Sequence, residues 1–112
     1  MENESKPETL VAGILERLAD GVGTIKVWGG HAVRPSDQFY EVKAASLEAS
    51  LLRVVLFLRL DGSEHIIEAE GIVGAKVTGT GLRVREATRV RVFGQEFLPR
   101  AGAADPALFL GP

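Results

Sequence analysis

The 112-residue chain contains no cysteine. Disulfide frameworks and thiolate metal sites are therefore excluded, as is catalysis by a cysteine nucleophile. A chain without cysteine suits a reducing compartment, so we expect a cytoplasmic location. The acidic and polar start, MENESKPETL, lacks the features of a secretory signal. No apolar run approaches the ~20 residues that cross a bilayer, and no membrane partner is expected.

The chain also lacks a strong excess of charge of either sign. Its formal net charge is −2, which gives no overall attraction to nucleic acid or to anionic membranes. Charge is nevertheless divided along the sequence. Residues 37–70 carry seven acids against three bases, whereas residues 76–100 carry six bases against two acids. These segments either pair across a sheet or leave one acidic face and one basic face.

The first regular element that the sequence indicates is a helix over residues 7–19. Ser5 to Glu8 has the pattern of a capping box, and Pro7 stands where the first helical turn tolerates proline. Apolar residues recur at helical spacing through LVAGILERL and form one stripe. Gly21 is placed to end the helix in a left-handed turn. We expect the stripe to pack on this chain's own sheet, with docking to a second subunit as the alternative.

After the helix the apolar residues change to the alternation that is typical of β-strands. Short strands separated by turn signals are expected within residues 24–93. The most apolar of them, LLRVVLFLRL at residues 51–60, suits a central strand covered on both faces, one of them by the helix. Asp61 and Gly62 indicate a β-hairpin. The predicted fold is α+β: an N-terminal amphipathic helix packed on a curved antiparallel sheet, or partial barrel, of six to seven short strands.

The expected organisation is one domain over residues 6–94. A disordered N-terminus over residues 1–5 precedes it, and a C-terminal tail over residues 95–112 follows it. The apolar residues 108–110 indicate that this tail docks on the chain's own sheet or on a neighbour's. Together with the helix stripe and open sheet edges, they point to a homodimer.

The stretch WGGHAVRPSDQFY, residues 28–40, holds the only Trp and the only Tyr together with a His, an Arg and an Asp. In a purely structural loop, Arg34 and Asp37 would pair and the two aromatic rings would stack at its base. In a binding site, the same side chains suit a small anionic or planar ligand. The ligand-binding residues expected on this interpretation are Trp28, His31, Arg34, Asp37 and Tyr40.

The same stretch gives weaker support for catalysis. His31 would be a base oriented by Asp37, but no nucleophile with a recognisable surround follows, because Ser36 lies in no nucleophile elbow. His31 and His65 match no zinc-ligand spacing. We therefore expect no catalytic residue, no metal and no cofactor. A small enzyme centred on His31 and Asp37 remains an alternative.

The segment LRVREATRVRV brings together four arginines, which are Arg83, Arg85, Arg89 and Arg91. On two strands joined at residues 86–88, all four would project to one side and could bind phosphates. No aromatic residue interleaves them, as a binder of single strands would require. The alternative is cross-strand pairing with the glutamates Glu64, Glu68 and Glu70. Nucleic-acid binding is therefore the second hypothesis, behind a non-enzymatic module that binds an unknown protein or a small anionic ligand.

Several short motifs resemble those of a family of small uncharacterised bacterial proteins. They are Trp28-Gly29, Arg34-Pro35 and Asp37, followed by the acidic hairpin turn DGSE, the segment REATRV and Phe93-Gly94. The family shows a W-G-x-x-x-x-R-P-x-D pattern, and the resemblance covers about residues 25–94. The chain departs from the pattern at residues 30–33, GHAV, where aromatic and glycine residues are usual. The resemblance implies a stand-alone bacterial domain and carries no activity onto any residue.

Overall fold

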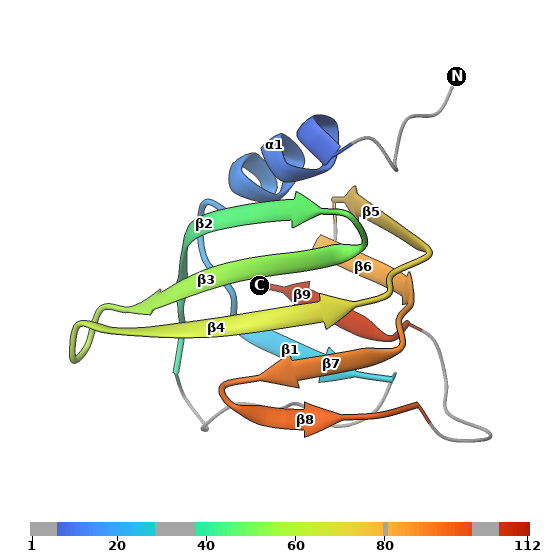
Figure 1. Cartoon of the computed structure of the whole chain (residues 1–112). Coiled ribbons are helices and arrows are strands. Elements are labelled where there is room, and N and C mark those ends of the chain that lie inside the picture. The colour runs from blue at the N-terminus through green and yellow to red at the C-terminus, as the bar shows by residue number, and fades with distance from the viewer. Residues whose placement is uncertain (1–6, 29–37, 80, 100–105) are drawn as a thin grey trace.

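The computed structural model describes residues 7–28, 38–79, 81–99 and 106–112. Within them, one helix precedes nine strands along the chain (Figure 1). The elements are α1 (Pro7–Arg17), β1 (Thr24–Val27), β2 (Glu41–Glu48), β3 (Leu51–Leu58), β4 (Ser63–Glu70), β5 (Gly74–Thr78), β6 (Gly81–Glu86), β7 (Arg89–Val92), β8 (Gln95–Phe97) and β9 (Leu108–Gly111).

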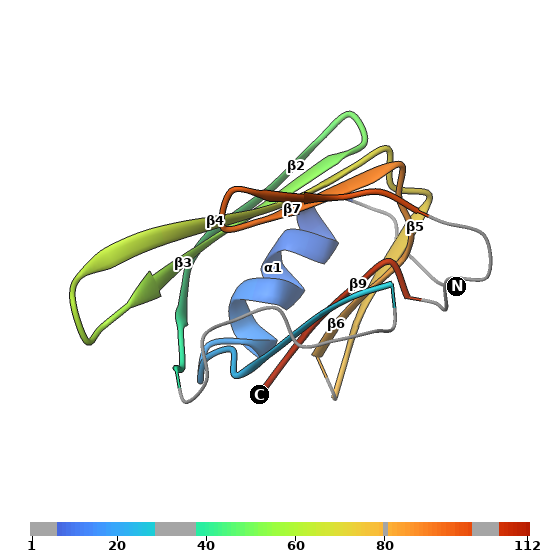
Figure 2. The same ribbon diagram turned by 90° about the horizontal axis from the view of Figure 1, so that it is seen from below.

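The strands form two antiparallel sheets that face each other. A four-stranded sheet has the order β1-β9-β6-β5, and a five-stranded sheet has the order β2-β3-β4-β7-β8. Figure 2 shows the two sheets as separate layers, and Figure 1 shows α1 at their edge, next to β2 and β5. The α+β class is confirmed. The expectation of one curved sheet or partial barrel with six to seven strands is corrected, because the described strands number nine and form two sheets without closing into a barrel.

The helix covers the side of this sandwich, where the edge strands β2 and β5 lie next to it. Its stripe of Leu10, Ile14 and Leu18 is buried in the core. It therefore does not cover the second face of β3, as the sequence led us to expect. Every second residue of β3, from Leu52 to Leu58, is buried. The residues between them, Val55 among them, face outward and are not buried. Among the described residues, no helix is long and apolar enough to cross a bilayer.

The C-terminal segment contributes an inner strand to the four-stranded sheet. In β9, Leu110 is opposite Ile25 of β1 on one side and opposite Leu82 of β6 on the other. Leu108 and Leu110 are fully buried. The apolar run in this segment therefore docks on the chain's own sheet. The close approach of β9 requires Gly81, whose φ is +128° and whose added Cβ would lie 2.2 Å from the carbonyl oxygen of Leu110.

Candidate functional site

The loop that carries His31, Arg34 and Asp37 lies outside the described residues. The ligand-binding interpretation of these three side chains, and the enzyme alternative built on two of them, therefore stay predictions. Trp28 stands at the end of β1 with a φ of +52°. It is half-buried against the core, and its backbone N–H donates to the carbonyl oxygen of Ala107 at 2.9 Å. Its position is thus fixed by packing and by a bond to Ala107, the residue that precedes β9.

Tyr40 is a core residue with an exposed fraction of 1%. Its backbone forms an isolated β-bridge with Val22, and its hydroxyl donates to Oε1 of Gln38 at 3.2 Å. Its ring lies 5.4 Å from that of His65 and 5.2 Å from that of Phe93, measured between centroids. The ring centroids of His65 and Phe93 are 5.0 Å apart, in an edge-to-face arrangement. Tyr40 therefore stabilises this end of the core.

A hydrogen-bonded chain of Asp61, Ser63 and His65 lies at the β3–β4 hairpin. Ser63 Oγ donates to Asp61 Oδ1 at 2.6 Å and lies 2.8 Å from Nε2 of His65. The side-chain bond from Ser63 holds the pKa of Asp61 below its ordinary value of 3.8, so the carboxylate is ionised and can only accept. Asp61 Oδ1 accepts from both the hydroxyl and the backbone N–H of Ser63. These bonds stabilise the turn of the hairpin.

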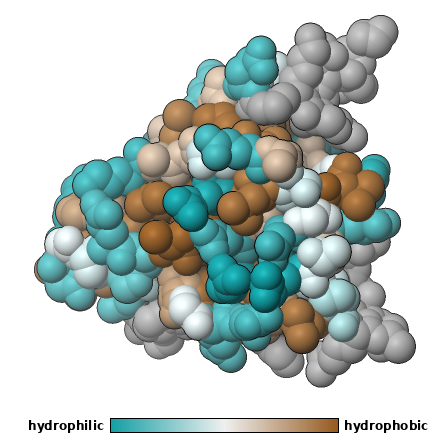
Figure 3. Space-filling view, in the orientation of Figure 1, coloured by the Kyte–Doolittle hydropathy of each residue, from teal (hydrophilic) through white to brown (hydrophobic). Residues whose placement is uncertain are grey.

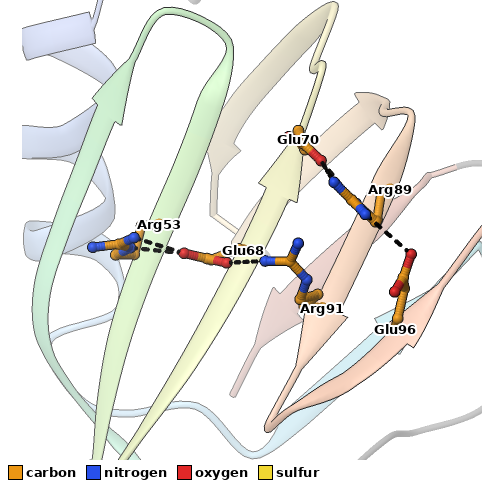
Figure 4. A network of polar contacts seen from close by, with 6 residues as sticks. All are labelled: Arg53, Glu68, Glu70, Arg89, Arg91 and Glu96. Atoms are coloured by element: carbon orange, nitrogen blue, oxygen red, sulfur yellow. Dashed lines mark hydrogen bonds and ion pairs between the residues drawn. The ribbon is translucent and has the colours of Figure 1, made fainter.

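On the outer face of the five-stranded sheet, the arginines are paired. Glu68 accepts from Arg91 at 2.8 Å through one oxygen and contacts Arg53 at 2.8 Å through the other (Figure 4). These three residues stand opposite one another on β3, β4 and β7. A carboxylate shared by two guanidinium groups fixes both of them in place.

Arg89 is held by two carboxylates on the same face. It forms an ion pair with Glu70 and a second with Glu96 at 3.3 Å, also drawn in Figure 4. The hydrogen bond with Glu70 is the main cause that raises the pKa of Arg89 further above its ordinary value. Figure 3 shows hydrophilic residues beside hydrophobic ones on this face. The expected pairing of the glutamates on β4 with arginines is confirmed for Glu68 and Glu70.

The expectation that Arg83, Arg85, Arg89 and Arg91 share one face is wrong. β7 pairs with β4 and β8, whereas β6 pairs with β5 and β9 of the other sheet. The residues between β6 and β7 carry the chain from one sheet to the other. At this crossing the backbone N–H of Thr88 donates to the carbonyl oxygen of Glu70 at 2.8 Å. Only the arginines of β6 lie on the four-stranded sheet.

The outer face of the four-stranded sheet gathers basic side chains from three strands. The strand registers place Lys26 opposite Phe109, Phe109 opposite Arg83 and Arg83 opposite Lys76. All three cations are exposed, whereas their neighbours along each strand point inward. Arg85, also exposed, lies two residues beyond Arg83. We call this set the basic face, and its members are Lys26, Lys76, Arg83, Arg85 and Phe109.

The charges of the basic face have no carboxylate partners in the part of the chain that the structure describes. Within the described residues, none of its four cations forms an ion pair. Strands β1, β5, β6 and β9 contain four bases and a single acid, Glu86, which gives a net charge of +3. The strands of the other sheet contain four bases and six acids, a net charge of −2. Cationic potential is therefore concentrated on one side of the molecule.

An aromatic residue lies among these cations. The centroid of the Phe109 ring is 5.6 Å from Cζ of Arg83, within the range of a cation–π contact.

Sequence reasoning missed Phe109 because it lies in the segment interpreted as a tail. It missed Lys26 and Lys76 because nothing local shows that their strands share a sheet with Arg83. The available signal was the alternation in TIKV, GAKVT and GLRVRE, which places a base between apolar residues each time.

Comparisons of the chain with protein-family models, with curated proteins and with solved structures give no match. The resemblance to small bacterial proteins with a W-G-x-x-x-x-R-P-x-D pattern therefore stays a prediction. The basic face is the strongest candidate site that the geometry provides.

Proposed function

We propose that this protein is a non-enzymatic binding module and that its basic face binds an anionic ligand. The observation that carries the proposal is the row of Lys26, Arg83 and Lys76 on one sheet face, without a carboxylate partner among the described residues. A cation without a partner can bind an incoming anion without first breaking an internal ion pair. Strands also fix the backbone positions from which these side chains extend, which lowers the entropy lost on binding.

The outer face of the other sheet is a poorer anion site, although it carries as many bases. Arg89 and Arg91 are each bonded to carboxylates there. An anion would have to displace those glutamates and would be repelled by them afterwards. The contrast between the two faces thus favours the basic face.

The shape of the row indicates the kind of anion. Adjacent strands lie ~4.8 Å apart, so the four strands from Lys26 to Lys76 span about 15 Å. A row of this length fits an extended ligand with several charges better than a small ion. We expect affinity to fall steeply as salt rises, because ions bound to such a ligand are released when the cations replace them.

The proposal is tested with inorganic polyphosphate, which carries charge and nothing else. We expect the full chain to bind it and Lys26→Gln and Lys76→Gln each to weaken binding several-fold. Arg53→Gln makes the same change of charge on the opposite sheet and serves as the matched control, which should bind as the parent does. Isothermal titration at two salt concentrations measures all four proteins. Equal affinity of the basic-face variants and the control would refute the proposal.

A second candidate function, protein interaction, is favoured by one observation on the five-stranded sheet. Ile66 is 45% exposed on its outer face and stands opposite the half-buried Val55, which is itself opposite Ala44. The surrounding charges are largely neutralised by internal ion pairs, so this face suits a surface without strong charge. A second copy of this chain is the partner we propose, and light scattering at high concentration should then detect a dimer. A strictly monomeric protein would remove this candidate.

A further inference from the structure

We infer that the ligand of the basic face is single-stranded nucleic acid, with a base stacked where Phe109 and Arg83 meet. This inference rests on the proposed anion-binding function and adds the ligand's chemical class. The feature that points to it is Phe109, which stands within the row of cations. Binding of a simple polyanion needs no aromatic ring, whereas proteins that bind single strands combine a basic track with rings on which bases stack.

The registers place the ring between charges on both sides. Phe109 of β9 is opposite Lys26 on β1 and opposite Arg83 on β6, and Lys76 follows on β5. A base that stacked at the ring would have phosphates on either side within reach of long, flexible cationic side chains. The ring that would stack on a base and the cations that would bind phosphates thus lie side by side on adjacent strands.

Arg83 enlarges the stacking platform. Its guanidinium lies over the Phe109 ring, with Cζ 5.6 Å from the centroid, and a guanidinium plane can itself stack on a base. Phe109 is half-buried, and the neighbours Leu108 and Leu110 anchor its strand in the core. The ring is therefore held in place before any ligand arrives, which reduces the entropy cost of stacking.

An anionic membrane is the main competitor for a basic face, and the apolar residues argue against it. Proteins that lie in the membrane interface combine attraction to anionic lipids with apolar side chains that enter the lipid. The large hydrophobic residues that the described part of the chain exposes are Leu15, Phe39, Leu60, Ile66, Val73 and Leu98, and none belongs to β1, β5, β6 or β9. On the basic face the one large apolar side chain that points outward, Phe109, is half-buried, with the Arg83 guanidinium over its ring.

Double-stranded nucleic acid fits less well than a single strand. In a duplex the bases stack on one another, and only their edges are accessible in the grooves. Phe109 would then have no partner, and only the charges of the face would contribute. The distribution of charge does not oppose a single strand, since six of the seven acids in the strands lie on the opposite sheet and only Glu86 lies on this one. Charges on the opposite sheet are screened beyond ~8 Å at physiological salt.

The test compares ligands with and without bases. The full chain is titrated into a labelled oligothymidylate of about a dozen nucleotides, a length within the range that one small domain covers, and into inorganic polyphosphate. We expect Phe109→Leu to weaken oligothymidylate binding roughly fivefold or more, with polyphosphate binding unchanged. Phe109→Tyr keeps an aromatic ring and should bind as the parent does, which separates loss of stacking from loss of folding. Thermal unfolding confirms that each variant is folded.

The salt dependence provides a second, independent criterion. Lys76→Gln should reduce the slope of log affinity against log salt by about 0.7, the value for one phosphate contact on a single strand. Phe109→Leu should leave that slope unchanged, because it removes no charge. Arg53→Gln on the opposite sheet should alter neither the affinity nor the slope.

The possible failures are distinguishable. If polyphosphate binds through Lys26 and Lys76 but Phe109→Leu has no effect on the oligothymidylate, the nucleic-acid inference is overturned and the anion-binding function stands. Tighter binding to phosphatidylglycerol vesicles than to the oligothymidylate, or equal affinity for a duplex, would also overturn it. If neither polyphosphate nor oligothymidylate binds, both the inference and the proposed function fail.

Discussion

Arg83 and Arg91 show how strongly the immediate surroundings determine what a side chain can do. Both are arginines on β-strands with a valine next to them. Arg91 forms an ion pair with Glu68 at 2.8 Å, so an incoming anion would have to displace that carboxylate. Arg83 lies over the ring of Phe109 and forms no ion pair with a carboxylate of the described residues. At the scale of the residue, the partner and not the residue type separates a structural arginine from a candidate ligand-binding one.

Asp61 should contribute to stability in a pH-dependent way. Its pKa is lowered in the folded protein, mainly by the hydrogen bond from the Ser63 side chain. A lowered pKa means that the contribution is present above the ordinary pKa of the carboxyl and is lost as pH falls through the folded value. Asp61→Ala should therefore be less stable than the parent at neutral pH, and the difference should shrink below about pH 4.

Urea unfolding at pH 7 and pH 3 measures this effect. Asp20→Ala removes a carboxylate from an exposed position after α1 and is the matched control. An equal loss of stability in Asp61→Ala at both pH values would show that the carboxylate charge has no part in holding the hairpin.

Gly81 and Gly79 offer a matched pair of glycine substitutions. Gly81 has a φ of +128°, and its added Cβ would lie 2.2 Å from the carbonyl oxygen of Leu110, whereas a Cβ at Gly79 would meet nothing within 4 Å. We expect Gly81→Ala to cost roughly 2–4 kcal/mol, because backbone strain and a clash with the neighbouring strand add. Gly79→Ala should change stability by less than about 0.5 kcal/mol. Chemical denaturation followed by circular dichroism measures both, and similar values would contradict the close approach of β9.

At the scale of the element, the helix and the last strand complete a sandwich that the central strands leave open. α1 lies against the edge strands of both sheets, and β9 fills the place between β1 and β6. Each is short, so neither would be stable alone in water. Their stability comes from the apolar residues they bury, and the fold depends on both ends of the chain.

The helix gives a direct test of this dependence. Ile14 of α1 is fully buried in the core, whereas the adjacent Leu15 is 41% exposed. Ile14→Ala should lower the free energy of unfolding by about 2–5 kcal/mol, through lost burial and the cavity left behind. Leu15→Ala is the control and should cost less than 1 kcal/mol or so. If urea denaturation gave equal losses, α1 would not be packed as described.

Local patterns predicted the elements better than their arrangement. The capping box and apolar stripe predicted a helix over residues 7–19, and it spans Pro7–Arg17. Asp61 and Gly62 predicted the hairpin that joins β3 to β4. Periodicity describes each strand by itself, and it carries no information on which strands pair. The division into two sheets, and with it the separation of Arg83 from Arg91, therefore could not be predicted from the pattern.

The candidate site was harder to predict than the fold for the same reason. Lys26 and Phe109 are neighbours on the basic face although they lie near opposite ends of the chain. The run LFLG of β9 is short and stands among glycine, proline and alanine, which is typical of a tail and masked its role as a strand. The ligand-binding site was predicted instead at residues 28–40, where unusual residues cluster in the sequence. The structure describes only the two ends of that stretch.

At the scale of the whole molecule, the two sheets divide the charge between opposite sides. The strands of one sheet carry a net +3 and those of the other a net −2. The overall charge of −2 hides this difference, because the two faces largely cancel. An anion approaching such a molecule is directed to the basic face and away from the acidic one.

The most direct test of this account is to map where a polyanion binds. Inorganic polyphosphate would be titrated into isotope-labelled full-length protein while the backbone amide resonances are followed by NMR. The account predicts shifts that cluster on β1, β5, β6 and β9, around Lys26, Lys76, Arg83 and Phe109, and that weaken as salt is added. Shifts concentrated instead on β4 and β7, or an absence of shifts on the four-stranded sheet, would contradict it.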